Sequence, residues 1–79
     1  MKIPRDLSGA DLIKLLKKYG YEPTRQTGSH VRLTTQQKGE HHITIPNHSP
    51  IKTGTLSAIL FDIGNHLGKS KEQLLHELF

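Results

Sequence analysis

Two stretches of the chain alternate polar and apolar residues with a period of two, the pattern of strands that bury one face. They are residues 30–34 and 42–45, and Pro46 ends the second stretch because proline cannot donate to a sheet ladder. The intervening residues 36–40 are polar and include a glycine, which favours a short hairpin loop. The pattern therefore predicts a β-hairpin.

The apolar positions also predict the register of this hairpin. Pairing Val31 with Ile45 and Leu33 with Ile43 gathers the aliphatic side chains on one face. A shift of one residue would bury charge and expose the aliphatics, so this register is strongly preferred. The opposite face is either an ordinary solvated surface or a functional one, and it carries His30, Arg32, Thr34, His42 and Thr44.

A helix and a strand are predicted before the hairpin. Apolar residues recur with helical spacing within residues 12–16, and Ser8 is placed to cap the start of that helix. Gly20 is placed to end it in the left-handed conformation. Residues 21–27 predict a more irregular first strand, which Pro23 marks as an edge strand.

Two further helices are predicted after the hairpin. The first begins near residues 53–54 and follows a helical apolar rhythm through Gly64, with Gly68 as its stop. Ser70 then caps a third helix, in which Gln73 completes a capping box.

The order of helix, three strands, helix and helix predicts an α+β fold. The chain of 79 residues contains no linker, repeat or low-complexity stretch, so we expect a single domain over residues 1–79. In the lead-in over residues 1–7, Ile3 and Leu7 are expected to touch the core.

Composition limits the kinds of site and the cellular location that we expect for this protein. The chain has no cysteine, so neither a disulfide nor a thiolate metal site contributes to the fold. No apolar run approaches the roughly 20 residues of a membrane span, and no secretion signal opens the chain, so we expect a cytoplasmic protein with no membrane partner.

The net charge of +4 is unevenly distributed. Residues 1–52 hold nine Lys or Arg against four acids, a balance of +5, whereas residues 53–79 hold two against three, a balance of −1. The basic excess falls on the first helix and the strands. This asymmetry favours a polyanionic partner, most simply a nucleic acid.

Histidine is the residue type in this sequence that is best suited to catalysis. The sequence has no Gly-rich phosphate loop, nucleophile elbow or cysteine nucleophile. Glu22 and Glu40 are the only carboxylates of the strand region, too few for paired-acid or acidic two-metal catalysis. The six histidines, in contrast, can carry protons near neutral pH.

His30 is the strongest candidate for a catalytic residue. The predicted register places it opposite Pro46 on the exposed face, two residues from Arg32. Because His48 follows Pro46 closely, the two imidazoles could flank one phosphodiester. One would remove the proton of a 2′-hydroxyl and the other would protonate the departing 5′ oxygen, which gives RNA cleavage without metal or cofactor.

Other groups could hold the phosphate of such a substrate. Arg32 or Lys52 could stabilise the charge of the phosphorane, and the amides that begin the second helix offer an anion site. The candidate RNA contacts are Gly28, Ser29, Arg32, Lys52, Gly54 and Thr55.

The remaining histidines have plainer interpretations. His41 and His42 could form a metal site with His48, but adjacent strand residues point to opposite faces, so at most one of that pair could join it. His66 and His76 lie on predicted helices and are expected to be surface residues. For His48, a hydrogen bond that structures the loop is the alternative to a catalytic role.

Four blocks of sequence occur in a distinctive order. They are Gly20-Tyr21, Gly28-Ser29-His30-Val31, Ile43-Thr44-Ile45-Pro46-Asn47-His48 and Gly54-Thr55-Leu56-Ser57-Ala58-Ile59-Leu60. Each block alone is weak, but together they are fairly specific and cover nearly the whole chain. In these blocks the chain resembles the HicA family, the small toxins of bacterial toxin–antitoxin pairs.

This resemblance implies a fold similar to that of double-stranded-RNA-binding domains, here with a short extra C-terminal helix. It also implies cleavage of mRNA, His30 as the catalytic histidine, and a HicB-type antitoxin that covers the active face. His48 and Gly54 match family positions, but the resemblance assigns them no catalytic role. Residues 65–67 and the third helix are variable in the family.

Two functions of different classes follow from these observations. The first is an endoribonuclease toxin with His30 as general acid or base. The second is a non-catalytic RNA-binding module on the same fold. A binder of double-stranded RNA would carry more basic residues at the start of its second helix than Lys52 alone, which argues against the second function.

Overall fold

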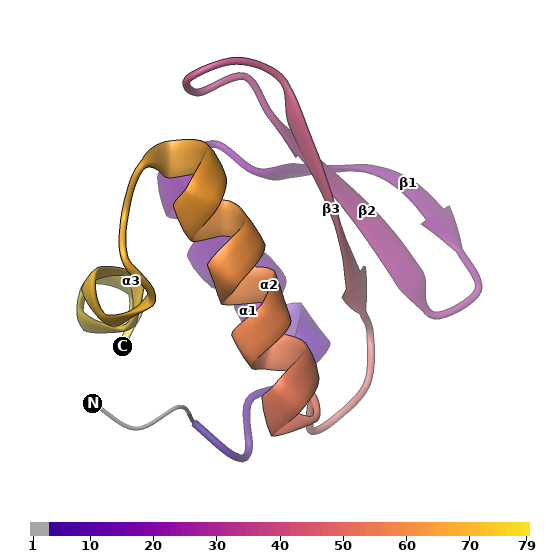
Figure 1. Ribbon diagram of the computed structural model, residues 1–79. Coiled ribbons are helices and arrows are strands. Elements are labelled where there is room, and N and C mark those ends of the chain that lie inside the picture. The colour runs from indigo at the N-terminus through magenta and orange to yellow at the C-terminus, as the bar shows by residue number, and fades with distance from the viewer. Residues whose placement is uncertain (1–3) are drawn as a thin grey trace.

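The computed structural model describes residues 4–79, so the expected core contact of Ile3 lies outside the described residues. The elements in chain order are α1 (Gly9–Leu16), the 3₁₀ turn η1 (Lys17–Tyr19), β1 (Glu22–Thr27), β2 (His30–Thr35), β3 (His41–Pro46), α2 (Thr53–Leu67) and α3 (Lys71–Leu78) (Figure 1). This order confirms the predicted α+β fold.

The strands form one antiparallel sheet in the order β1-β2-β3. Val31 pairs with Ile45 and Leu33 with Ile43, so the predicted register of the hairpin is confirmed. The side chains of these residues are buried on the inner face of the sheet. His30 pairs with Pro46 and is exposed on the outer face, as predicted.

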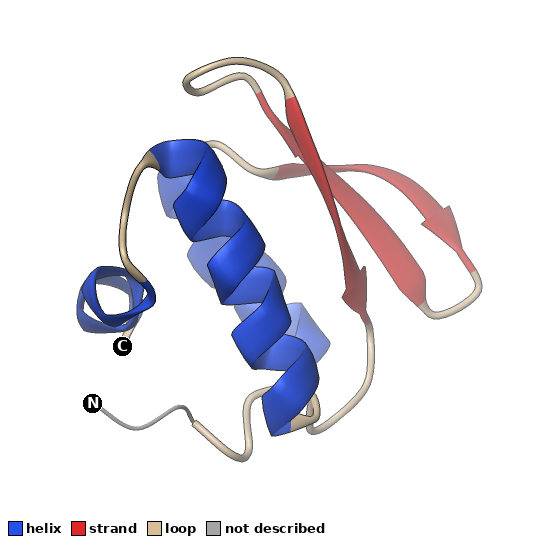
Figure 2. Ribbon diagram, in the orientation of Figure 1, coloured by secondary structure: helices blue, strands red, loops and turns tan. Residues whose placement is uncertain are grey.

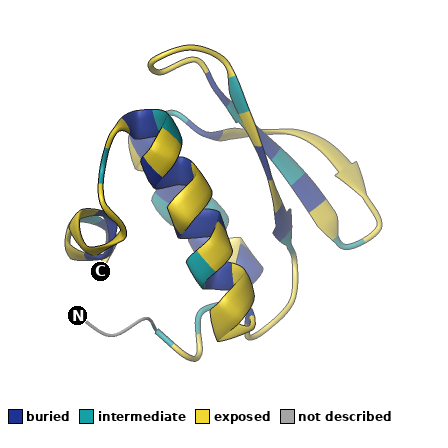
Figure 3. Cartoon of the chain, viewed as in Figure 1, coloured by how far each residue is buried: buried dark blue, intermediate teal, exposed yellow. Residues whose placement is uncertain are grey.

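The helices all lie on the inner side of the sheet (Figure 2). α1 and α2 both contact β3, and α3 packs on α2, on the side away from the strands. The buried residues lie where the helices face the sheet and where the helices face one another (Figure 3). The residues of β1, in contrast, are exposed along the whole strand. The outer face of the sheet is therefore covered by no helix of the described chain.

Most predicted helix ends are confirmed by hydrogen bonds. The hydroxyls of Ser8 and Ser70 each accept a hydrogen bond from the backbone N–H three residues later, at 3.0 and 3.1 Å. α1 ends at Leu16 and continues as η1 to Gly20, which is left-handed with φ 80°. α2 passes through Gly64 and ends at the left-handed Gly68. Leu7 packs against the core, as predicted.

β1 contains one extra residue relative to β2. The register between the two strands shifts between Pro23 and Arg25, so that Thr24 is the additional residue. Because successive strand residues point to opposite faces, an extra residue reverses the alternation on one side of it. Tyr21 can therefore be fully buried on the inner side while Arg25 points outward.

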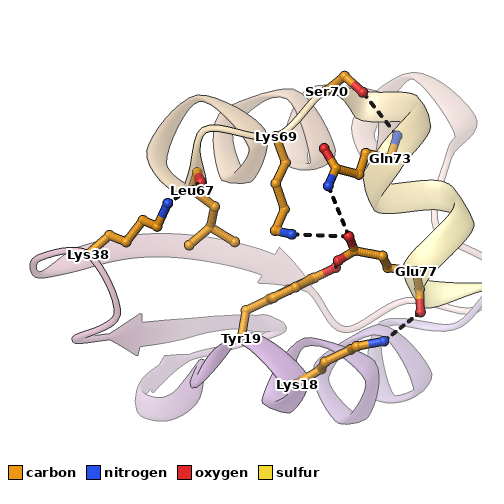
Figure 4. A network of polar contacts seen from close by, with 8 residues as sticks. All are labelled: Lys18, Tyr19, Lys38, Leu67, Lys69, Ser70, Gln73 and Glu77. Carbon is orange, nitrogen blue, oxygen red and sulfur yellow. Dashed lines mark hydrogen bonds and ion pairs between the residues drawn. The ribbon is translucent and has the colours of Figure 1, made fainter.

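Glu77 joins α3 to the rest of the molecule (Figure 4). Its carboxylate accepts hydrogen bonds from the Tyr19 hydroxyl at 2.6 Å, from Lys69 Nζ at 3.0 Å and from Gln73 Nε2 at 3.2 Å. Lys18 Nζ donates to the Glu77 carbonyl oxygen at 2.9 Å. The hydrogen bond from Tyr19, followed by that from Lys69, lowers the pKa of Glu77 to about 2.

Within residues 4–79, none of the helices combines the length and the apolar character needed to cross a bilayer.

The Glu77 contacts predict a dependence of stability on pH. The pKa of Glu77 is lowered from an ordinary value of 4.5, so its stabilising contribution is present above pH 4.5 and is lost as the pH falls towards 2. We expect Glu77→Gln to lower the urea midpoint at pH 7, and the difference from wild type to shrink between pH 5 and pH 2. Glu72→Gln, which removes a carboxylate elsewhere on α3, serves as the control. A difference independent of pH would contradict the prediction.

Gly9 lies where α1 meets the end of β3. Its N–H donates to the His48 carbonyl oxygen at 2.8 Å, and a Cβ there would clash with the Pro46 carbonyl oxygen and lie 2.8 Å from Asn47 Cα. We therefore expect Gly9→Ala to destabilise the protein by about 1–3 kcal/mol in urea unfolding. Gly54→Ala is the matched control, because a Cβ at Gly54 meets nothing within 4 Å and should leave stability unchanged or raise it by up to about 1 kcal/mol. Equal effects of the two substitutions would contradict this account.

Candidate active site

The outer face of the sheet contains an open pocket of about 220 Å³. Residues from all three strands line it: Arg25, Thr27, His30, Arg32 and Thr44. Because this is the face that no helix covers, the pocket opens directly to solvent.

Strand pairing places these side chains in two rows. Arg25 pairs with Arg32, and Arg32 pairs with Thr44, so one row crosses the whole sheet. Thr27 pairs with His30 in the adjacent row on the same face. The two rows are two residues apart along the strands, which is about 7 Å, so long side chains from both rows can reach one small group.

The chemistry of the pocket suits an anion. Its lining contains two guanidinium groups, one imidazole and two hydroxyls, and no carboxylate. Guanidinium groups form paired hydrogen bonds with phosphate oxygens, and an exposed imidazole can exchange protons near neutral pH. The combination can bind a phosphodiester and present a proton-transfer group beside it.

The structure brings together only some of the predicted site residues. His30 and Arg32 line the pocket, whereas the other predicted residues do not. Gly28 and Ser29 form the turn that joins β1 to β2, next to His30. The residues outside the lining are all exposed except Ser29, which is half-buried: Gly28, Ser29, His48, Lys52, Gly54 and Thr55.

His48 lies in the segment between β3 and α2. Its backbone carbonyl oxygen accepts the hydrogen bond from Gly9 that ties this segment to α1, and its side chain is exposed. The neighbouring Asn47 N–H donates to the Ser29 carbonyl oxygen at 2.6 Å, which holds the segment beside the β1–β2 turn.

His41 and His66 form a separate cluster. His41 Nε2 donates to the Asp62 carboxylate at 3.2 Å, so its neutral ring accepts at Nδ1 from the Tyr21 hydroxyl at 2.7 Å. The two imidazoles stack with centroids 4.3 Å apart, and His66 Nε2 donates to the Gln37 carbonyl oxygen at 2.8 Å. Burial, followed by the charge of Asp62, raises the pKa of Tyr21 to about 12.

The prediction that His66 is a plain surface residue is therefore wrong. Its ring is held between His41 and the β2–β3 loop, so it fastens that loop to α2. The sequence gives no direct signal of this contact, because residues 37 and 66 meet only when α2 packs on the sheet. His76, in contrast, is exposed, as predicted.

The predicted divergence of the adjacent histidines is confirmed. His41 contacts Tyr21 and Asp62, whereas His42 contacts Thr34 and Glu40 on the outer face. Among residues 4–79, no three His, Asp or Glu side chains gather in an arrangement that could hold a metal ion.

Arg25 and Thr27 are the lining residues that sequence reasoning missed. The signal was present in the tight Gly28-Ser29 turn, because counting back from a two-residue turn pairs Thr27 with His30. The irregular alternation of residues 21–27 obscured it.

A comparison with protein-family models identifies the family of the chain. The family model described as the HicA toxin of bacterial toxin-antitoxin matches residues 9–64 of the chain. The chain belongs to the HicA toxin family. It is thus the toxin of a toxin–antitoxin system, and its partner is an antitoxin. No curated protein and no solved structure matched the chain.

The HicA family match spans the whole candidate site. Residues 9–64 include α1, the complete sheet and most of α2, and therefore every residue that lines the pocket. α3 and its Glu77 contacts lie beyond the matched residues.

The pocket predicts how substitutions change RNA affinity. We expect Arg25→Gln and Arg32→Gln each to weaken the binding of a short single-stranded RNA and to reduce the slope of log affinity against log salt concentration by about 1. Lys14→Gln on α1, which removes an exposed charge outside the pocket, should have a smaller effect. The measurement is fluorescence anisotropy at several salt concentrations. Equal losses for all three variants would argue against the pocket as the phosphate site.

Proposed function

We propose that this HicA-family toxin is a metal-independent endoribonuclease that cleaves mRNA, with His30 as a general acid or base. The observation that supports it best is the position of His30 in the same open pocket as Arg25 and Arg32, in the row next to this arginine pair. Cytoplasmic mRNA is the proposed substrate, and a HicB-type antitoxin that covers the outer face of the sheet is the proposed partner.

The proposed reaction is an internal transesterification. The 2′-oxygen forms a bond to phosphorus, the bond from phosphorus to the 5′ oxygen breaks, and a 2′,3′-cyclic phosphate results. The 2′-hydroxyl loses a proton and the leaving 5′ oxygen gains one. His30 serves one of these two transfers, since a positioned imidazole is suited to either near neutral pH.

The arginines would stabilise the charge that develops on phosphorus. Arg25 and Arg32 come from adjacent strands and are paired across the sheet, so their guanidinium groups can hold both non-bridging oxygens. The hydroxyls of Thr27 and Thr44 offer further donors at the edges of the pocket.

His48 is the proposed second proton-transfer group. Its segment is held beside the β1–β2 turn through the Asn47–Ser29 hydrogen bond, and its side chain is free to reach a bound RNA from that side. Lys52 and the amides of Gly54 and Thr55 would contact phosphates further along the strand.

The test compares wild type with His30→Ala on a 5′-labelled mRNA in EDTA, with folding checked by circular dichroism. Loss of general acid–base catalysis should lower the cleavage rate by about 10²- to 10⁴-fold. His76→Ala, at an exposed histidine of α3, should cleave like wild type.

The other outcomes are equally informative. Cleavage that survives in folded His30→Ala would assign the chemistry to another residue, and His48→Ala would then be assayed in the same way. Cleavage only with added divalent metal would contradict the metal-independent mechanism. RNA binding without cleavage by wild type would make the protein a non-catalytic RNA-binding module.

A further inference from the structure

A second polar assembly lies on the outer face, beside the pocket and separate from it. Thr24 Oγ1 and Thr34 Oγ1 are 2.9 Å apart, Thr34 Oγ1 and His42 Nδ1 are 2.7 Å apart, and His42 Nε2 lies 2.8 Å from Glu40 Oε2. The chain of contacts crosses all three strands of the sheet and ends in the β2–β3 loop.

The direction of these hydrogen bonds follows from their chemistry. The Glu40 carboxylate only accepts, so His42 Nε2 donates to it, and the neutral ring then accepts at Nδ1 from Thr34. Both nitrogens of His42 are therefore already bonded, and the ring is held in one orientation. The side chain is still 36% exposed, so part of the ring is accessible to a ligand although both nitrogens are bonded.

The charge at this end of the sheet is opposite to that of the pocket. Hydrogen bonds from His42 and Gln36 lower the pKa of Glu40, so it is a carboxylate at neutral pH. Glu22 pairs with Thr34 across the β1–β2 ladder and adds a second carboxylate on the same face. A phosphate would be repelled here, whereas a group that donates hydrogen bonds would be attracted.

We propose that His42, Glu40 and Thr34 form a nucleobase subsite, which binds the base next to the phosphate held by Arg25 and Arg32. The base stacks on the His42 ring, and an amino group on its edge donates to Glu40. The proposal rests on the proposed function, because it requires RNA bound on this face.

The spacing fits one nucleotide. Thr34 lies two residues beyond Arg32 on β2, which is about 7 Å along the strand. This is comparable to the distance between a phosphate and the base of its own nucleotide. Stacking on an aromatic side chain is a general mode of single-stranded RNA recognition, and base edges then supply selectivity.

The test uses binding, so that it does not depend on cleavage. The probe is a short 2′-O-methyl RNA that cannot form a cyclic phosphate, together with versions that carry one abasic nucleotide at each position in turn. For wild type, we expect an abasic nucleotide at one position to weaken binding by about tenfold more than elsewhere, as the loss of one stacked base would.

The protein variants identify the side chain that holds the base. In His42→Ala the position-specific loss should disappear, and in His42→Phe, which keeps a flat ring without nitrogens, it should return. Glu40→Gln should reduce the preference for bases with an amino group and leave the abasic profile otherwise intact. His76→Ala is the matched control and should reproduce the wild-type profile.

Two results would overturn the subsite: a flat abasic profile for wild type, or a profile that His42→Ala leaves unchanged. A uniform loss of affinity at every position in His42→Ala would indicate a structural role only. The proposed ribonuclease function is tested in a separate experiment. Absence of cleavage of unmodified RNA by wild type in EDTA would contradict that function without bearing on the base subsite.

Discussion

The structure depends on the alternation of side chains along β2. This strand is the central one and is paired on both edges. Because successive side chains point to opposite faces, Val31 and Leu33 lie in the core while His30 and Arg32 lie on the outer face. A slip of one residue against either neighbour would exchange the two sets. Burial of the aliphatic face therefore fixes the register of the strand. The same register positions the polar side chains of the site on the outer face.

The parts of the fold that were predictable from sequence rest on strong local patterns. The hairpin register followed from aliphatic residues at every second position, and the helix ends followed from Ser8, Ser70 and Gly68. The site was harder to predict because it depends on contacts between strands. Arg25 joins it only through the extra residue in β1, and His48 lies outside the lining although it follows Pro46 by two residues.

Two adjacent histidines show how one strand serves both sides of the sheet. His41 turns inward, where Tyr21 and Asp62 saturate its nitrogens and His66 stacks on its ring. His42 turns outward and is saturated just as fully by Thr34 and Glu40. The hydrogen bonds of His41 fasten the hairpin to α2, whereas those of His42 fix a ring on the face available to ligands.

The extra residue in β1 marks a point where this strand tolerates a change in length. Pro23 pairs with Leu33 and Arg25 with Arg32, so Thr24 has no partner of its own in the ladder. Removal of Thr24 would leave a regular ladder with the same pairs, and the residues on either side of it would keep their faces. The strand can therefore lose this residue without losing either the core contacts or the arginine pair.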